Sequence, residues 1–298
     1  MNNIYLSKYA SAVENALKLK PTDDVYGDIE KLRPDGYIEL PIDTSILDKH
    51  NLFRKYMNLV ETDTADGVLT INTSASLPVV VDEDNKAFVE DESTAELRYK
   101  AYKLGLIVKA KGSTVNDLKI NMTDYLRKTL SKRYGKAEEK LILNGTGVKE
   151  PLGLLNYDLG CVSVPEITYD SVIDLFFSLD KDYRDEAIFI TNDETALKLR
   201  KLKDDSVNYL WNNADSTILG KKVIISNYMA NPSKPLLFGN FTYLTFLLRE
   251  RIAVKVLKEL YLENGDIGYA SKERLDFKLT EVNACKVLIL ESLENNQN

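Results

Sequence analysis

The residues with the most reactive side chains in this 298-residue chain do not form a catalytic set. His50 is the single histidine, which excludes a histidine metal cluster and would leave a Ser-His-Asp triad dependent on this residue alone. It lies between Lys49 and Asn51 in a predicted polar turn, where a solvated side chain is expected. Cys161 and Cys285 lack a Cys-x-x-Cys spacing, so we expect free, packed thiols in a cytosolic setting.

Three further groups of residues are candidates for a site. Gly145-Thr146-Gly147 is not followed by Gly-Lys-Ser/Thr and comes after a predicted helix, so it is not a phosphate-binding loop. Glu138 and Glu139 point about 100° apart on a helix, so they do not converge as an acid/base pair. We expect both to be charges on the helix surface or at a subunit contact. Tyr209 and Trp211 are expected to anchor a core or an interface. The sequence therefore predicts no catalytic, cofactor-binding or metal-binding residue.

Composition indicates a folded protein with a sizeable core. Hydrophobic residues make up 44% of the chain, which suits one or two domains. The net charge of −7 argues against a protein dominated by phosphate contacts, because such proteins carry a basic surface. The start of the chain has no secretory signal pattern, and no apolar run approaches the ~20 residues that span a bilayer.

The longest amphipathic pattern predicts a helix from Met122 to Leu143. Asn121 and Asp124 have the spacing of a capping box at its start, and Asn144-Gly145 predicts its end. At 1.5 Å per residue this helix is about 33 Å long. The apolar positions recur every three or four residues, at Leu118, Met122, Leu126, Leu130, Tyr134, Ala137 and Leu141.

The segments before this helix have little apolar material of their own. Residues 1–45 are polar and interrupted by prolines, with one helical stretch from Tyr9 to Leu19. Residues 66–98 contain β-rich runs separated by acidic residues, which predicts a long hairpin. Residues 97–111 are predicted as one strand, whose lysines either guard a sheet edge or contact acidic residues of a partner, with the acids of 82–92 as candidates.

After the helix the pattern alternates between helices and strands. The apolar spacing around 172–179 predicts a helix, and a buried strand is expected over 187–190. Thr191 to Glu194 has capping-box spacing, so a second helix should follow. Further strands are expected over 219–226, 236–241, 252–256, 274–279 and 287–290.

Several short motifs occur in a fixed order along the chain. They are the helix end Ala137-Glu138-Glu139, the turn Leu143-Asn144-Gly145-Thr146-Gly147, the restart Pro151-Leu152-Gly153-Leu154-Leu155, the strand Arg274-Leu275-Asp276, and Glu281 and Ala284. In this order the motifs resemble those of the major capsid protein of tailed bacteriophages, the Hong Kong 97 type, over about residues 46–290. Lys222 stands where that family often has proline, and Asn240 where it often has aspartate, neither of which should break a strand.

The resemblance implies an α+β, Hong Kong 97-like capsid fold, in which the long helix is the spine of a peripheral domain. It implies an N-terminal arm over 1–45, the start of the peripheral domain over 46–61, an extended β-hairpin loop over 62–98, the peripheral domain with the spine helix over 99–150, an axial α/β domain over 151–235, peripheral return strands over 236–280 and an axial C-terminal segment over 281–298.

The function implied is a phage or prophage major capsid protein that self-assembles into hexamers and pentamers of an icosahedral shell around double-stranded DNA. The expected partners are other copies of the chain, scaffold, portal and head-maturation proteins, and DNA held without sequence-specific contacts. We expect no cofactor, no enzymatic activity and no membrane contact. The expected location is the virion, after assembly in the bacterial host cytoplasm. The alternatives are an encapsulin-like nanocompartment shell, a soluble α/β enzyme and a monomeric binding module. The arm and the hairpin, which have few apolar residues of their own, fit a monomeric binding module badly.

Some relatives join subunits through a lysine–asparagine isopeptide bond promoted by a buried glutamate; Lys86 lies in the predicted hairpin, but no asparagine aligns clearly near 265–275, so cross-linking is not expected. Many relatives also begin with a long scaffolding segment that a protease removes. About 45 residues precede the matching region here, and Met1 favours a separate scaffold protein over a processed segment.

Overall fold

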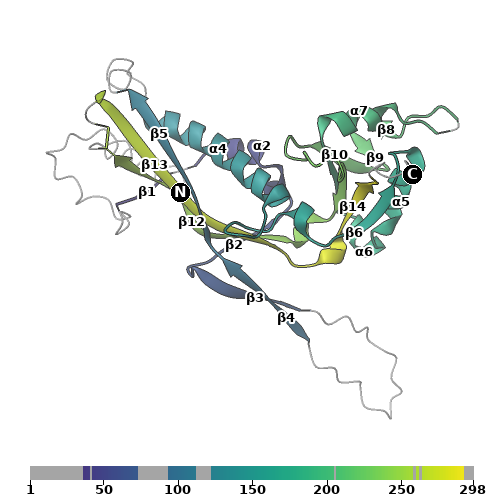
Figure 1. Ribbon diagram of the computed structural model, residues 1–298, viewed down its shortest axis with the longest axis horizontal. Coiled ribbons are helices and arrows are strands. Elements are labelled where there is room, and N and C mark those ends of the chain that lie inside the picture. Colours follow the sequence, from purple (N-terminus) through teal and green to yellow (C-terminus); the bar gives the residue numbers. More distant parts are fainter. Residues whose placement is uncertain are drawn as a thin grey trace, which may run out of the picture.

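The computed structural model describes residues 36–40, 42–72, 93–111, 122–204, 206–257, 260–261 and 264–291. Two β-sheets lie end to end, each with helices packed on it, and a two-stranded ribbon projects away from the first sheet (Figure 1). The expected N-terminal helix over 9–19 and the β-rich runs over 77–89 lie outside the described residues.

The first sheet is built around two long antiparallel strands, β12 (Leu244–Leu257) and β13 (Asp266–Leu279). Its strand order is β1-β12-β13-β5, and β2 pairs with β12 in parallel. The register of β12 against β13 shifts between Leu248 and Ala253, which is typical of a β-bulge. The outer strands are β1 (Ile38–Glu39), β2 (Asn58–Glu61) and β5 (Tyr102–Lys111).

The long helix α4 (Met122–Asn144) lies across one face of this sheet, as the sequence predicts (Figure 1). Leu126, Leu130 and Tyr134 are buried in one cluster with apolar residues of β12 and β13. The Tyr134 hydroxyl donates to Ser271 Oγ at 3.1 Å. Asn121, the expected cap, lies outside the described residues.

A short helix, α2 (Thr44–His50), packs beside α4, followed by the 3₁₀ turn η2 (Leu52–Lys55). Gly135 permits this close approach, because a Cβ there would lie 2.9 Å from the carbonyl oxygen of Leu47. The two helices therefore form one layer on the sheet. In the described part of the chain, no helix combines the length and the apolar character that a bilayer crossing requires.

The second sheet has the strand order β6-β14-β11-β7-β10-β9-β8. Its central strand β7 (Ile188–Thr191) is buried throughout, which confirms the predicted buried strand. The other strands are β6 (Gly160–Val164), β8 (Trp211–Asn212), β9 (Thr217–Ile218), β10 (Lys221–Ile225), β11 (Leu236–Gly239) and β14 (Cys285–Leu290).

Helices α5 (Tyr169–Ser178), α6 (Lys181–Arg184) and α7 (Asp193–Lys201) belong to the second sheet's layers. The N-cap of α7 is Asn192, whose side chain accepts a hydrogen bond from the amide of Thr195 at 2.7 Å. The cap therefore lies one residue after the predicted Thr191, because Thr191 belongs to β7. The 3₁₀ turns are η3 (Leu154–Asn156), η4 (Phe241–Tyr243) and η6 (Val282–Ala284).

The single strand expected over 97–111 is wrong, because the structure divides it into β4 (Thr94–Lys100) and β5 at Ala101. β4 pairs with β3 (Asp66–Asn72), whereas β5 pairs with β13. The amide of Lys100 donates to the Asp276 carboxylate at 2.9 Å, and the amide of Ala101 donates to the carbonyl of Ala65 at 2.7 Å. These bonds replace ladder bonds where the chain changes partner.

The sheets also divide the chain differently from the expected boundaries. β11 pairs with β7 and β14 in the second sheet, so the return to the first sheet comes after Gly239 and not at 235. In the expected arm, Ile38 and Glu39 pair with β12 of the first sheet. Strand pairing, which depends on distant residues, decides both boundaries.

Candidate functional site

The ribbon of β3 and β4 is the part of the described structure with the least support from its own subunit. Its two strands pair only with each other, and their side chains alternate between exposed and half-buried positions. The half-buried face is mostly apolar, with Leu69 opposite Leu97 and Ile71 opposite Ala95. An isolated two-stranded ribbon is at best marginally stable in water. This face therefore gains stability if another surface covers it.

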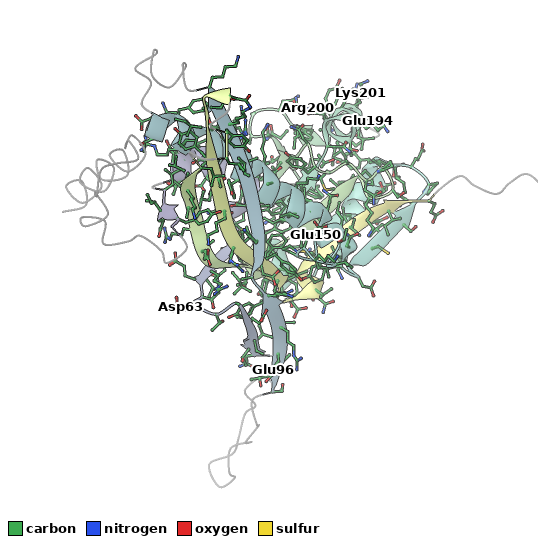
Figure 2. The ribbon with its side chains drawn as sticks, turned by 60° about the vertical axis from the view of Figure 1, so that its left-hand side comes forward. Asp63, Glu96, Glu150, Glu194, Arg200 and Lys201 are labelled. Carbon is green, nitrogen blue, oxygen red and sulfur yellow. The ribbon has the colours of Figure 1, made fainter. Side chains whose placement is uncertain are left out.

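The base of the ribbon is held firmly, in contrast to its outer part. Tyr99 donates or accepts hydrogen bonds at 2.8 Å with both Thr62 Oγ1 and Thr64 Oγ1. The Tyr99 ring crosses directly over Gly67, where a Cβ would lie 2.4 Å from the phenol oxygen. Figure 2 shows Asp63 at this base and Glu96 further out on the ribbon. The ribbon thus leaves the sheet in a defined direction.

A buried charge cluster joins the segment before the ribbon to α4 and β13. The guanidinium of Arg54 donates two hydrogen bonds of 2.7 Å to the two carboxylate oxygens of Glu138. The Asn51 side-chain amide donates a third, also 2.7 Å, to Glu138. Glu273 on β13 lies 3.7 Å from Arg54. A single cation therefore serves two buried carboxyl groups.

Glu273 has the more difficult environment of the two carboxyl groups. It is 1% exposed, and its Oε2 atom has no hydrogen-bond partner among the described residues. Burial, followed by the neighbouring charge of Glu138, raises the pKa of Glu273 well above its usual value, and the charge of Arg54 only partly opposes this. The surroundings of Glu273 therefore favour its protonated form over the carboxylate.

Glu139 forms a second buried connection on the neighbouring side of α4. Its carboxylate accepts a 2.5 Å hydrogen bond from Ser226 Oγ, at the end of β10, and a 3.3 Å bond from the amide of Leu52. Burial raises the pKa of Glu139, while the Ser226 bond opposes the shift. This side chain connects α4 to both the N-terminal segment and the second sheet.

The expectation that Glu138 and Glu139 are surface charges is therefore wrong. They are 0% and 5% exposed. Their different directions on the helix are as predicted, since each side chain has its own set of partners. The partners that make burial possible, Arg54 and Ser226, are 84 and 87 residues distant in the sequence. No local pattern identifies them.

The turn after α4 depends on close backbone contacts. A Cβ at Gly145 would lie 2.2 Å from the carbonyl oxygen of Pro151, and one at Gly153 would lie 2.4 Å from the amide nitrogen of Gly145. The Glu150 carboxylate accepts hydrogen bonds of 2.9 Å from the amide and the hydroxyl of Thr146. The turn is therefore a tightly packed structural connection. Its two Thr146 donors already bond to the Glu150 carboxylate.

The remaining candidates from the sequence do not converge with these groups. His50 ends α2 and is partly buried, so it is not the solvated turn residue expected; burial, then the charges of Lys132, Lys136 and Lys49, lower its pKa. Cys161 is exposed, contrary to the expected packed thiol, whereas Cys285 is buried, which raises its pKa to about 12.

The two aromatic candidates divide between core and surface. Trp211 is 2% exposed, with the Arg200 guanidinium 4.6 Å from its ring centroid, which supports a core anchor. Tyr209 is 55% exposed and lies under Lys203. The rings of Trp211 and Tyr209 therefore do not form a common stacking surface.

An open depression of about 630 Å³ lies between the end of α5, α6 and the start of β14. Its walls carry both charge signs but neither cysteine nor histidine. Across the part of the chain that the structure describes, no group of three potential metal ligands occurs. The depression is lined by Phe177, Ser178, Leu179, Asp180, Lys181, Asp182, Tyr183, Arg184, Asn283 and Lys286.

The profile described as "Phage capsid family" matches residues 44–289. No match is found among curated proteins. A solved structure described as the capsid of a native GTA particle is 19% identical, with a TM-score of 0.68 and coverage of 95% of this chain and 99% of that chain.

Two phage structures are similar in the same way. That from Microbacterium phage Oxtober96 is 16% identical, with a TM-score of 0.62 and coverage of 93% of this chain and 97% of that chain. That from Gordonia phage Cozz is 11% identical, with a TM-score of 0.63 and coverage of 81% and 87%. At these identities the likeness concerns the fold.

Proposed function

This chain belongs to the phage capsid family and has the Hong Kong 97-like α+β fold, and we propose that its copies form the hexamers and pentamers of an icosahedral head around double-stranded DNA. As a capsid protein it is a structural component of a virion and associates with further copies of itself. We also propose that the shell contains both hexamers and pentamers, that it encloses double-stranded DNA and that it assembles in the bacterial cytoplasm.

The observation that supports this proposal best is the projecting ribbon. Its apolar face, with Leu69 and Leu97, is left half-exposed by the described part of its own subunit. In a shell the same face would lie on a neighbouring copy. Each such contact can be weak, because many identical contacts form together. The ribbon would then correspond to the extended loop expected over 62–98.

We propose further partners on the basis of family membership. A scaffold protein would direct curvature, a portal would occupy one vertex, and head-maturation proteins would act after packaging. The DNA would be held without sequence-specific contacts. An encapsulin-like shell, the alternative, would contain a protein cargo in place of nucleic acid.

The first experiment is to purify the full chain and examine it by analytical ultracentrifugation and electron microscopy. Rings or closed shells support the proposal, and a monomer at all protein and salt concentrations would overturn it. Shells with an excess of absorbance at 260 nm would contain nucleic acid, whereas shells with a co-purifying protein would indicate the compartment.

A matched pair of variants tests the role of the ribbon. Leu69→Lys places a charge on the half-buried face, and Thr70→Lys places the same charge on the exposed face of the same strand. We expect the first to abolish or strongly reduce shells while the second assembles normally. Equal assembly by both variants would show that this face is not a subunit contact.

A further inference from the structure

The outward face of α4 carries a regular row of cations. Lys128, Lys132, Lys136 and Lys140 follow one another at intervals of four residues, and all four are exposed. Four residues correspond to a rise of about 6 Å, so the row is about 18 Å long. Arg133 is exposed on the same side of the helix. We call these five residues the α4 basic row.

The α4 basic row has no ion-pair partner within the described part of the subunit, although Lys136 is close enough to Glu139 to oppose the raised pKa of that carboxyl group. None of its five side chains forms an ion pair with another described residue. Asp124, the acid in the first turn of α4, pairs with Arg127 at 3.1 Å. Lys132 and Lys136 contribute to the lowered pKa of His50, after burial, so their field reaches the neighbouring helix.

Several cations on the strands of the first sheet are paired within the subunit: Lys109 with Asp266 at 2.7 Å, Lys272 with Glu250 at 3.0 Å and Lys278 with Asp276 at 3.2 Å. The α4 basic row, in contrast, groups on one helix five cations that form no ion pair with another described residue.

This arrangement does not stabilise the subunit itself. Like charges four residues apart on a helix repel, and the row contains three such pairs in succession. The whole chain has a net charge of −7, so the row does not simply reflect a basic overall composition. An anionic partner would remove the repulsion and turn the row into a source of binding energy.

We propose that the α4 basic row binds the phosphate backbone of double-stranded DNA, and that α4 therefore lies on the inner side of the shell. This inference rests on the proposed function. Lysine ammonium groups act on phosphates as point charges and carry no sequence information. The row runs obliquely along α4, because each step of four residues turns about 40° around the helix. A duplex presents a continuous line of charge, one per about 3.4 Å along each strand, against which such a row can lie.

An acidic polypeptide is the competing partner, and the acids of 82–92 in a second copy are its nearest source. Peptide docking generally uses apolar anchors in addition to charge. Of the described side chains of α4, Tyr125 is the single exposed large hydrophobic residue, and it lies at the first end of the row. The row thus offers charge with little apolar surface, which favours a nucleic acid backbone.

The test measures binding of the unassembled full chain to a short fluorescent duplex by anisotropy, over a series of salt concentrations. If about four phosphates are neutralised, log K should fall against log salt with a slope of about −3.6. Lys132→Gln with Lys136→Gln should reduce the slope by about 1.8 and weaken binding at low salt at least about tenfold. The Lys→Arg pair at the same positions should retain binding.

The control is Lys201→Gln with Lys222→Gln, which makes the same charge change at exposed residues of α7 and β10. Figure 2 labels Lys201. We expect this control to bind like the unmodified chain. Equal losses in both double variants, or no binding by the unmodified chain at low salt, would overturn the proposal.

Electron microscopy of the same preparations separates this proposal from the proposed function. Normal shells together with no difference in DNA binding would refute the DNA contact and leave the shell intact. If Lys132→Glu with Lys136→Glu blocks assembly, and reversing Glu90 and Asp91 to lysine restores it, the row binds a second copy and the DNA proposal is wrong.

Discussion

Replacing Arg54 by methionine should destabilise the subunit strongly. Arg54 is the cation that balances Glu138, which is 0% exposed and receives both guanidinium bonds at 2.7 Å. Removal of one partner of a buried ion pair typically costs about 3–5 kcal/mol, because the other charge stays buried and unpaired. Asn51 still donates one bond to Glu138, so we expect a loss near the lower end, about 3 kcal/mol.

The assay is urea unfolding of the unassembled chain, followed by circular dichroism, with Arg54→Lys and the double variant Arg54→Met, Glu138→Gln as controls. Lysine preserves the charge but not the two parallel bonds, so its loss should be intermediate. In the double variant no unpaired carboxylate remains at position 138, so it should recover much of the stability.

A loss below about 1 kcal/mol in Arg54→Met at neutral pH, the size expected of an exposed pair, would refute the interpretation of this cluster.

Three further predictions concern other parts of the molecule. Burial raises the folded-state pKa of Glu273, so the contribution of this carboxyl group to stability is present below its ordinary pKa of 4.5 and is lost as the pH rises through the folded-state pKa. Glu273→Gln should therefore gain stability relative to the unmodified chain as the pH rises, which thermal melts over a series of pH values would measure. Parallel pH profiles of the two proteins would contradict this. Gly145→Ala should cost about 1–3 kcal/mol through its backbone clash, whereas Gly105→Ala, with its nearest contact at 3.6 Å, should be tolerated; equal melting temperatures would contradict the packed turn. A thiol reagent should modify exposed Cys161 in the native chain and reach buried Cys285 only after unfolding, as peptide mass spectrometry would show, and rapid native labelling of both would be inconsistent with this burial.

The elements that are regular along the chain could be predicted from the sequence. The 3.6-residue spacing of Leu126, Leu130 and Tyr134 identifies α4 because a helix that covers a sheet needs one apolar stripe. The buried strand β7 is evident from its uninterrupted apolar residues. The order of the motifs supports the family assignment, which the profile match over 44–289 establishes.

Features that depend on distant partners could not be predicted. Charged residues on a helix are ordinarily exposed, and only the positions of Arg54 and Ser226 explain why Glu138 and Glu139 are buried. The break at Ala101 is invisible in the alternation of 97–111, because both halves are strands and only their partners differ. The α4 basic row cannot be distinguished in the sequence, because its lysines have the pattern of an ordinary solvated helix face and only the described structure shows that they form no ion pairs there.

The direct passage from β4 into β5 has a mechanical consequence. Figure 1 shows β4 running into β5 in nearly the same direction. Ala101 lies between the two strands in the sequence. β5 is paired with β13 through ten successive residue pairs, from Tyr102 with Leu275 to Lys111 with Asp266. Tension applied to the outer ribbon would therefore load all of these pairs in shear at once, rather than unzip them singly, and a shell under internal pressure would distribute its strain into the middle of each subunit.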